Sequence, residues 1–204
     1  MARAPREGEF NVGFVGRIVP IKDVKTFIVA AKLLLDRVPE ARFHLIGPDD
    51  EDPGYAAECR RLAVDLKIQD QVVFVGRADV RKYYEFLDVV VLTSIREAQP
   101  LVILEAWAAG IPCVSTDVGN VSELLEDDRR FIAPPKDAAR IAEGIEYVRA
   151  HPEESAAVAA RNRERVARDY EKKDLLARYG ELYSRFAGPR PLAAAAPPGP
   201  GKAD

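Results

Sequence analysis

Short apolar runs that alternate with segments of helical periodicity are the feature that most limits how this chain can fold. Residues 11–16 read NVGFVG, and apolar residues then recur at helical spacing from Val24 to Leu35. Further apolar runs follow at residues 42–47, 72–75, 89–92, 112–115 and 131–132. Strands that are apolar almost throughout are buried on both faces, as in parallel sheets covered by helices. The pattern therefore predicts an α/β fold with a doubly wound parallel sheet.

Helical patterns fill the spaces between these runs and continue after the last run as far as residue 186. The expected helices lie at residues 55–66, 81–86, 101–109, 137–150, 153–169 and 171–186. The last residues are mostly proline, alanine and glycine, and a segment with so little to bury is expected to be disordered. We therefore expect an N-terminal extension at 1–10, one folded domain at 11–186 and a disordered tail at 187–204.

The charges of the chain are balanced, which limits the partners it can have. Lys and Arg number 30 and Asp and Glu 33, for a net charge of −3, and the two signs are interspersed. A polybasic face for nucleic acid or an anionic membrane is therefore not expected. The opening residues MARAPREGEF lack the apolar region of a signal peptide, and no apolar stretch reaches membrane-spanning length. We expect a cytoplasmic protein that neither binds nucleic acid nor inserts into a membrane.

Several common kinds of active site have no counterpart in the sequence. Cys59 and Cys113 stand alone, so we expect buried thiols rather than metal ligands. His44 and His151 have no serine or cysteine nucleophile in a recognisable elbow, so a hydrolytic triad is not expected. The first apolar run is followed by GRIVPIK rather than GxGxxG, which disfavours a nicotinamide cofactor.

Two carboxylates flank the start of one expected helix. Glu97 lies in the polar turn after an apolar run, and Glu105 lies about one turn into the helix that follows. Free backbone amides and the positive dipole end make a helix start an anion site. Leu101 and Leu104 share a helix face with Glu105, which places this carboxylate beside an apolar stripe. Because a carboxylate in such a place needs hydrogen-bond donors, we interpret Glu105 as facing a ligand rather than as a solvated helix charge.

Two loops that follow apolar runs carry a glycine and cations. Gly16, Arg17 and Lys22 come after the first run, where the ligands of parallel sheets bind. Such cations can hold a diphosphate through charge-assisted hydrogen bonds, although a solvated loop has the same composition. Gly76 and Arg77 repeat the strand-Gly-Arg pattern, where Gly76 can simply turn the chain.

A third loop offers a different chemistry. Asp50, Glu51 and Asp52 are successive carboxylates, which are the hard ligands that Mg²⁺ prefers. Successive acids after a proline are also typical of a solvated turn. A metal-dependent phosphotransfer or hydrolase domain that uses residues 49–52 stays open as an alternative.

The region around Glu97 resembles the retaining glycosyltransferases of family four. Their signature is a Glu, seven residues, and a second Glu followed by Ala and a small-residue run ending in Gly-x-Pro. The chain reads Glu97, AQPLVIL, Glu105, AWAAGIP, and VGRIVPIKD resembles the family's phosphate loop. The segments IGPDDEDPGYAAECR and SIREAQPLVILEA are similar to the glycosyltransferases of bacterial Pel exopolysaccharide synthesis. The resemblance implies the carboxyl half of the two-domain GT-B fold, a Rossmann-like nucleotide-sugar-binding domain with extra C-terminal helices.

The resemblance also implies roles for the residues at the helix start. Glu97 would contact the donor sugar, where it positions the sugar and stabilises charge, and Glu105 would accept hydrogen bonds from ribose hydroxyls. The leaving diphosphate would be neutralised by a larger set, namely Arg17, Lys22 and the amides of Leu101 and Val102.

Other positions are assigned through the same resemblance. The turn at Gly76 and Arg77 would meet the nucleobase, on which Arg77 or Tyr83 would stack. Gln99-Pro100 departs from the aromatic and glycine common in the family, and because Pro100 has no amide to donate, Gln99 is left as the candidate sugar contact.

The implied reaction takes a nucleotide sugar, with UDP favoured, and needs no metal or other cofactor. The acceptor, a glycan or another molecule, would bind an N-terminal domain that is absent from this chain. We therefore expect the isolated chain to bind nucleotide and to turn over little. A non-catalytic nucleotide-binding module of the same fold is the second alternative.

Overall fold

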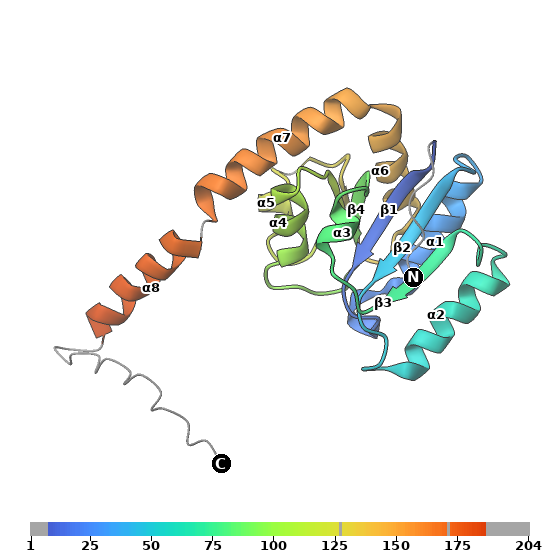
Figure 1. Cartoon of the computed structure of the whole chain (residues 1–204), viewed down its shortest axis with the longest axis horizontal. Helices are drawn as coiled ribbons and strands as arrows, with labels where there is room; N and C mark the ends of the chain where they lie inside the picture. The colour runs from blue at the N-terminus through green and yellow to red at the C-terminus, as the bar shows by residue number, and fades with distance from the viewer. Residues whose placement is uncertain (1–7, 127, 171, 187–204) are drawn as a thin grey trace, which may run out of the picture. The chain divides into compact units, whose positions relative to one another are not determined.

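The computed structural model describes residues 8–126, 128–170 and 172–186. At its centre is one parallel sheet with the strand order β3-β2-β1-β4-β5-β6 (Figure 1). The strands are β1 (Phe10–Val15), β2 (Ala41–Ile46), β3 (Val72–Gly76), β4 (Val89–Leu92), β5 (Cys113–Thr116) and β6 (Ile132–Ala133). Each lies within one residue of an apolar run singled out in the sequence, and the predicted doubly wound α/β fold is confirmed. The predicted tail at 187–204 lies outside the described residues.

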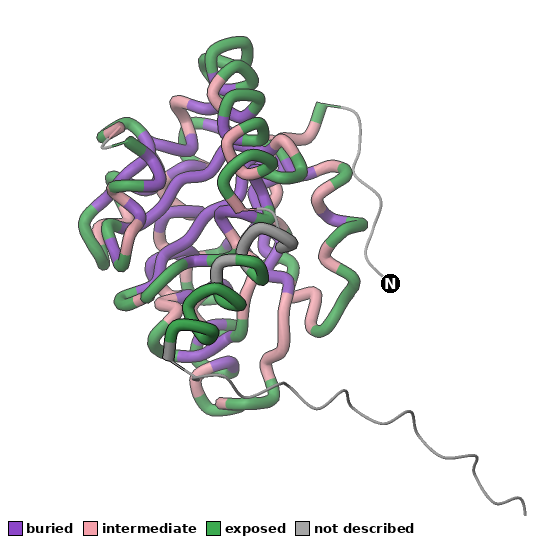
Figure 2. Tube along the Cα trace, turned by 90° about the vertical axis from the view of Figure 1, so that its left-hand side faces the viewer, coloured by how far each residue is buried: buried purple, intermediate pink, exposed green. Residues whose placement is uncertain are grey.

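Helices cover both faces of the sheet. They are α1 (Val24–Leu35), α2 (Pro53–Asp65), α3 (Arg81–Tyr84), α4 (Leu101–Ala108), α5 (Val121–Leu124), α6 (Ala138–Ala150) and α7 (Pro152–Asp169), with a 3-10 turn η1 (Pro20–Lys22). Helix α1 packs against α2 and α6 on one face, and α3 and α4 lie on the other (Figure 1). The strands are buried between these layers, while the outer sides of the helices are exposed (Figure 2). The sequence did not predict η1 or α5, because one helical turn is too short to show a period.

The chain divides into two units, residues 1–167 and 168–204. The described part of the second unit contains α8 (Lys172–Phe186), which matches a predicted helix. Its exposed apolar side chains are Leu176, Tyr179, Leu182 and Tyr183. Within the described ranges, every helix is too short or too polar to cross a membrane.

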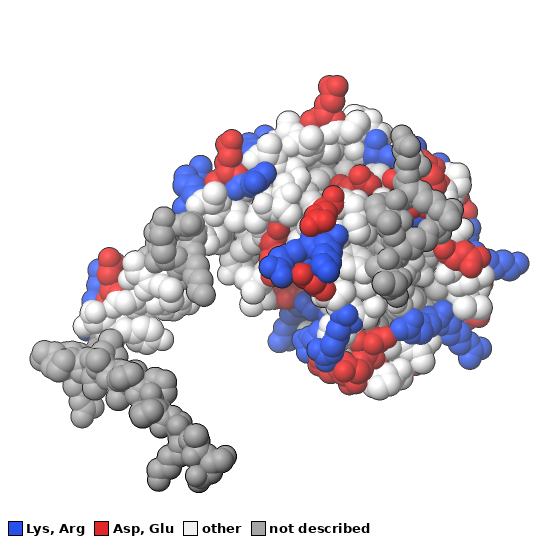
Figure 3. Space-filling view, viewed as in Figure 1, with Lys and Arg blue, Asp and Glu red and all other residues white. Residues whose placement is uncertain are grey.

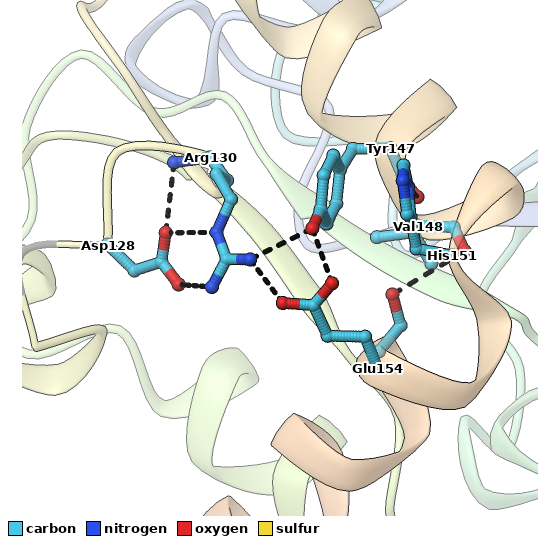
Figure 4. A network of polar contacts seen from close by, with 7 residues as sticks. Asp128, Arg130, Tyr147, Val148, His151 and Glu154 are labelled. Atoms are coloured by element: carbon cyan, nitrogen blue, oxygen red, sulfur yellow. Dashed lines mark hydrogen bonds and ion pairs between the residues drawn. The ribbon is translucent and has the colours of Figure 1, made fainter.

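A polar network fastens the corner between α6 and α7 to the turn that precedes β6 (Figure 4). The guanidinium of Arg130 donates to Asp128 at 2.7 Å and to the Tyr147 hydroxyl at 2.9 Å. Tyr147 in turn donates to Glu154 at 2.5 Å, and its ring stacks on His151. Because the contacts join the turn before β6 to both α6 and α7, they hold these two helices against that turn.

One buried imidazole lies among the central strands. His44 on β2 is 7% exposed, and its Nε2 lies 3.0 Å from Oδ1 of Asn11 on β1. Burial lowers the pKa of His44, an effect that Arg42 reinforces and Glu9 opposes. The folded protein therefore holds this imidazole in its neutral form at neutral pH.

We expect the free energy of unfolding to decrease as the pH is lowered, because of His44. Below about pH 6.5 the unfolded chain binds a proton at this residue that the folded chain does not. The free energy of unfolding then decreases toward acid, by at most about 1.4 kcal/mol per pH unit, until the lowered folded-state pKa is reached. Urea unfolding between about pH 7.5 and 5.5 measures this slope, which His44→Gln should reduce. His151→Gln, at the exposed histidine, is the matched control; an equal change in both variants would contradict the assignment.

Candidate functional site

The loops after β1 and β4 meet at one edge of the sheet. These two strands are neighbours although other strands separate them in sequence, so the strand order reverses between them. In open α/β sheets, ligands bind in the crevice beyond the carboxyl ends of the strands at such a point. Lys22 in η1 and Glu97 in the loop after β4 meet here, with Nζ 2.6 Å from Oε1. Their side chains are only 20% and 15% exposed, so this ion pair is largely shielded from water.

Buried hydroxyls hold this pair in place. Ser94 Oγ donates to the same Glu97 oxygen at 2.7 Å, and Thr93 Oγ1 donates to the Lys22 carbonyl at 3.0 Å. Thr116 Oγ1 at the end of β5 donates to the Ser94 carbonyl at 2.7 Å. All three hydroxyl residues are fully buried. Their hydrogen bonds therefore hold the loop in place and are not made to solvent. Sequence reasoning missed Ser94; the signal was a hydroxyl pair placed directly after an apolar strand.

Helix α4 begins beside this pair. Its N-cap residue is Pro100, and no side chain caps its first turn. Leu101 is 62% exposed, and the buried residues of the helix are Ile103, Leu104, Ala106 and Trp107. The expectation that Leu101 belongs to the apolar stripe beside Glu105 is wrong, because the sheet buries the side of the helix that carries Ile103 and Trp107. The first turn of the helix thus combines an exposed leucine with amides that no side chain caps.

Glu105 lies on the exposed side of α4 and has a partner that the sequence did not suggest. Tyr84 at the end of α3 donates its hydroxyl to Glu105 Oε2 at 3.3 Å. Burial, and then the charge of Glu105, raise the pKa of Tyr84, so the phenol stays a donor. Tyr83 is buried against His44 and Phe86. It is therefore not free to stack on a nucleobase, and that prediction is wrong.

The two arginines of the prediction pair with the acidic loop. Arg17 Nη1 lies 2.5 and 2.8 Å from the two oxygens of Glu51, and both side chains are 51% exposed. Arg77 Nη2 lies 3.0 and 3.1 Å from the oxygens of Asp50. The bond from Arg77 lowers the pKa of Asp50. The structure thus joins Lys22 directly to Glu97, whereas Arg17, in the same loop as Lys22, and Arg77, after β3, pair with the acidic loop that follows β2.

Each carboxylate of the acidic loop has its own partner in the protein, and the four do not share one partner. Asp49 pairs with Arg60, and Asp52 accepts the Tyr55 amide at 3.0 Å as the N-cap of α2. In the described ranges, no group of three or more His, Cys, Asp or Glu side chains is arranged to hold a metal ion. The cysteines are free and buried, as predicted, and burial raises the pKa of Cys59 to about 11, so this thiol is unreactive at neutral pH.

Comparison with known proteins identifies the family to which this chain belongs. The family model described as glycosyl transferases group 1 matches residues 9–151, which contain the whole sheet and the loops that carry Lys22 and Glu97. The chain belongs to this family. Its domain has the Rossmann-like form of the GT-B fold, with extra helices at the carboxyl end.

Relatives with this fold are longer than the present chain. A D-inositol 3-phosphate glycosyltransferase of Saccharomonospora viridis is 30% identical over 189 residues, which make up 87% of this chain and 44% of that protein. Sucrose-phosphate synthase of Thermosynechococcus elongatus superimposes with a TM-score of 0.78 at 28% identity, over 88% of this chain and 46% of its own. Anabaena HepE in complex with UDP gives a TM-score of 0.80 at 24% identity, over 87% and 49% of the two chains, and shows the shared fold. The chain spans less than half the length of each of these proteins.

Proposed function

We propose that this chain is the donor-binding domain of a retaining glycosyltransferase of family four that uses a UDP-linked sugar. The observation that carries the proposal is the shielded Lys22–Glu97 pair beside the uncapped start of α4, at the reversal point of the sheet. A cation and free helix amides suit a diphosphate, and a carboxylate next to them suits sugar hydroxyls. A structural neighbour solved with UDP supports the choice of nucleotide.

Each side chain of the site has a distinct part in the proposed reaction. Lys22 and the amides of Leu101 and Val102 stabilise the charge that grows on the diphosphate as its bond to the sugar breaks. Glu105 accepts from ribose hydroxyls, and Tyr84 fixes the direction of its carboxylate. Glu97 orients the donor sugar while the acceptor oxygen bonds to the anomeric carbon on the face that the diphosphate leaves, and the hydroxyl proton of the acceptor passes to the oxygen of the departing diphosphate.

The remaining assignments extend the proposal to the periphery of the site. Arg17 follows Gly16 and reaches the diphosphate when it leaves Glu51. The turn of Gly76 and Arg77 meets the base, and Gln99 meets the sugar. The reaction needs no metal ion or other cofactor, because cations of the chain supply the counter-charge.

In the longer protein, we place the acceptor, a glycan or another molecule, on a second domain. Exopolysaccharide synthesis in the cytoplasm is the setting that we propose, by the likeness of the segment that contains Asp50 to the Pel enzymes. The chain by itself then binds donor and transfers little, because the acceptor side of the cleft is supplied elsewhere.

Calorimetric titration with UDP, ADP and GDP tests this function. We expect UDP to bind most tightly, and EDTA to leave its affinity unchanged. Lys22→Ala should weaken UDP about tenfold or more, because each factor of ten corresponds to about 1.4 kcal/mol and a charge-assisted bond to phosphate exceeds that value. Lys25→Ala is the matched control, since Lys25 forms an exposed pair with Glu58 on α2. Loss of binding on chelation would support the metal-dependent alternative. Unchanged UDP affinity in Lys22→Ala would show that Lys22 does not bind the diphosphate.

A further inference from the structure

The loop between β2 and α2 is fixed at both of its ends. Gly47 donates its amide to the Gly76 carbonyl at 3.0 Å, and the Pro48 carbonyl accepts the Ile18 amide at 2.9 Å. Gly47 approaches Gly16 so closely that a Cβ on Gly47 would lie 2.0 Å from the Gly16 carbonyl oxygen. These bonds join the loops after β1, β2 and β3 at one edge of the sheet. At the other end of the loop, Asp52 is tied to the first turn of α2, so residues 49–51 have little freedom to move.

The acids between these anchors each hold an arginine from a different place. Asp49 holds Arg60 of α2, Asp50 holds Arg77 after β3, and Glu51 holds Arg17 after β1. The guanidinium of Arg60 lies over the ring of Phe74 on β3, and Arg60 is not a donor-binding candidate, whereas Arg77 and Arg17 are. Acidic and basic side chains are likewise interspersed, rather than gathered by sign, on the face seen in Figure 3.

We propose that Glu51 is a specificity-determining residue of the donor site, because it is an exchangeable counter-ion that a ligand must displace from Arg17. The inference rests on the proposed function and deepens it. It follows that Glu51 sets how strongly the site prefers phosphate-bearing ligands over a nucleoside: its carboxylate competes with the ligand phosphate for Arg17 and so reduces that preference. A nucleoside without phosphate gives Arg17 nothing in exchange for Glu51 and leaves the pair intact.

The geometry indicates which partner moves. The two side chains are equally exposed, but Glu51 belongs to the anchored loop and Arg17 has the longer side chain. Exposed ion pairs contribute little to stability, so Arg17 can change partner at a small cost. A diphosphate offers Arg17 charge-assisted bonds of the same kind as those that it gives up, and it carries more negative charge than one carboxylate. Glu51 thus lowers the affinity for phosphate-bearing ligands without preventing their binding.

Titration of UDP and uridine into Glu51→Gln tests the inference. The substitution keeps the size of the side chain and removes its charge at an exposed position. We expect UDP to bind about two- to fivefold more tightly than to the wild-type chain, which is the range that an exposed ion pair allows, and uridine to bind equally well to both. Asp49→Asn is the matched control: it removes the same charge from the same loop but frees Arg60, so UDP affinity should change little.

A double variant completes the test. In Arg17→Ala, the further change Glu51→Gln should give no gain in UDP affinity, because no cation is left to release. The inference is overturned if Glu51→Gln binds UDP no better than wild type, if Asp49→Asn gains as much, or if the gain persists without Arg17. Wild-type binding of UDP is measured in the same series. Its absence would overturn the proposed function and this inference together, whereas wild-type binding with no gain in Glu51→Gln overturns only the inference.

Discussion

Glu97→Gln in the longer protein, with its acceptor side present, should lower sugar transfer at least about 100-fold while UDP affinity is no weaker than in the wild type. Glutamine has the same shape, so Ser94 and Lys22 can still donate to its carbonyl oxygen. Only the negative charge is lost. A charge that stabilises the transition state and not the nucleotide lowers the rate without lowering nucleotide affinity.

The shielding of Glu97 is the reason to expect a large effect. Its side chain is 15% exposed and meets Lys22 and Ser94 through one oxygen, Oε1. The partners of Oε1 orient the carboxylate within a site of low dielectric, where a fixed charge acts more strongly than it does in water. Lys22 is also released from its counter-charge in the variant, and this favours the diphosphate rather than opposing it.

Initial rates with saturating donor, together with calorimetry of UDP, measure the two effects separately. Glu123→Gln, at an exposed position on α5, is the control for loss of a surface charge. A variant that transfers sugar at the wild-type rate would refute the role of Glu97. Equal losses in UDP affinity and in rate would instead assign Glu97 to nucleotide binding.

The strands could be predicted from sequence, because a strand buried on both faces must be apolar almost throughout. Val89–Leu92 shows this directly, since every residue of the run is buried. The position of the crevice followed from the rule that ligands bind at the carboxyl ends of strands. Lys22 and Glu97, which are 75 positions apart, do meet there. Their assignment to a donor sugar remains a prediction.

What the sequence could not give depends on which side of an element faces inward and on how loops approach one another. Helix α4 is apolar almost all round, so its period does not show that Leu101 is exposed and Trp107 buried. The pairing of Arg17 with Glu51 depends on the close approach of Gly47 to Gly16, and no spacing along the chain encodes that approach. The bond from Tyr84 to Glu105 likewise joins helices that are brought together only by the sheet.

Gly119→Ala should be a strongly damaging small substitution in the loop after β5. Gly119 has φ +58°, and a Cβ there would lie 2.4 Å from the Ala98 carbonyl oxygen and 2.8 Å from that of Glu97. The left-handed backbone costs a non-glycine residue about 1–2 kcal/mol, and overpacking against fixed atoms adds about 1–3 kcal/mol. We therefore expect the free energy of unfolding to fall by about 2–5 kcal/mol. The obstructed atoms belong to the loop that leads into α4, and the amides at the start of this helix bind the diphosphate in the proposed function, so UDP should also bind at least about threefold more weakly.

Gly110→Ala separates the two contributions. Gly110 has φ +78°, and a Cβ there would meet no atom within 4 Å, so this variant carries the backbone cost alone. Urea unfolding should place its loss at about 1–2 kcal/mol, with UDP affinity unchanged. If both variants lost the same stability, the contact of Gly119 with the Glu97–Ala98 backbone would contribute nothing. A larger loss in Gly119→Ala together with weaker UDP binding would show that the loop after β5 supports the segment of residues 97–100 that leads into α4, where the diphosphate is proposed to bind.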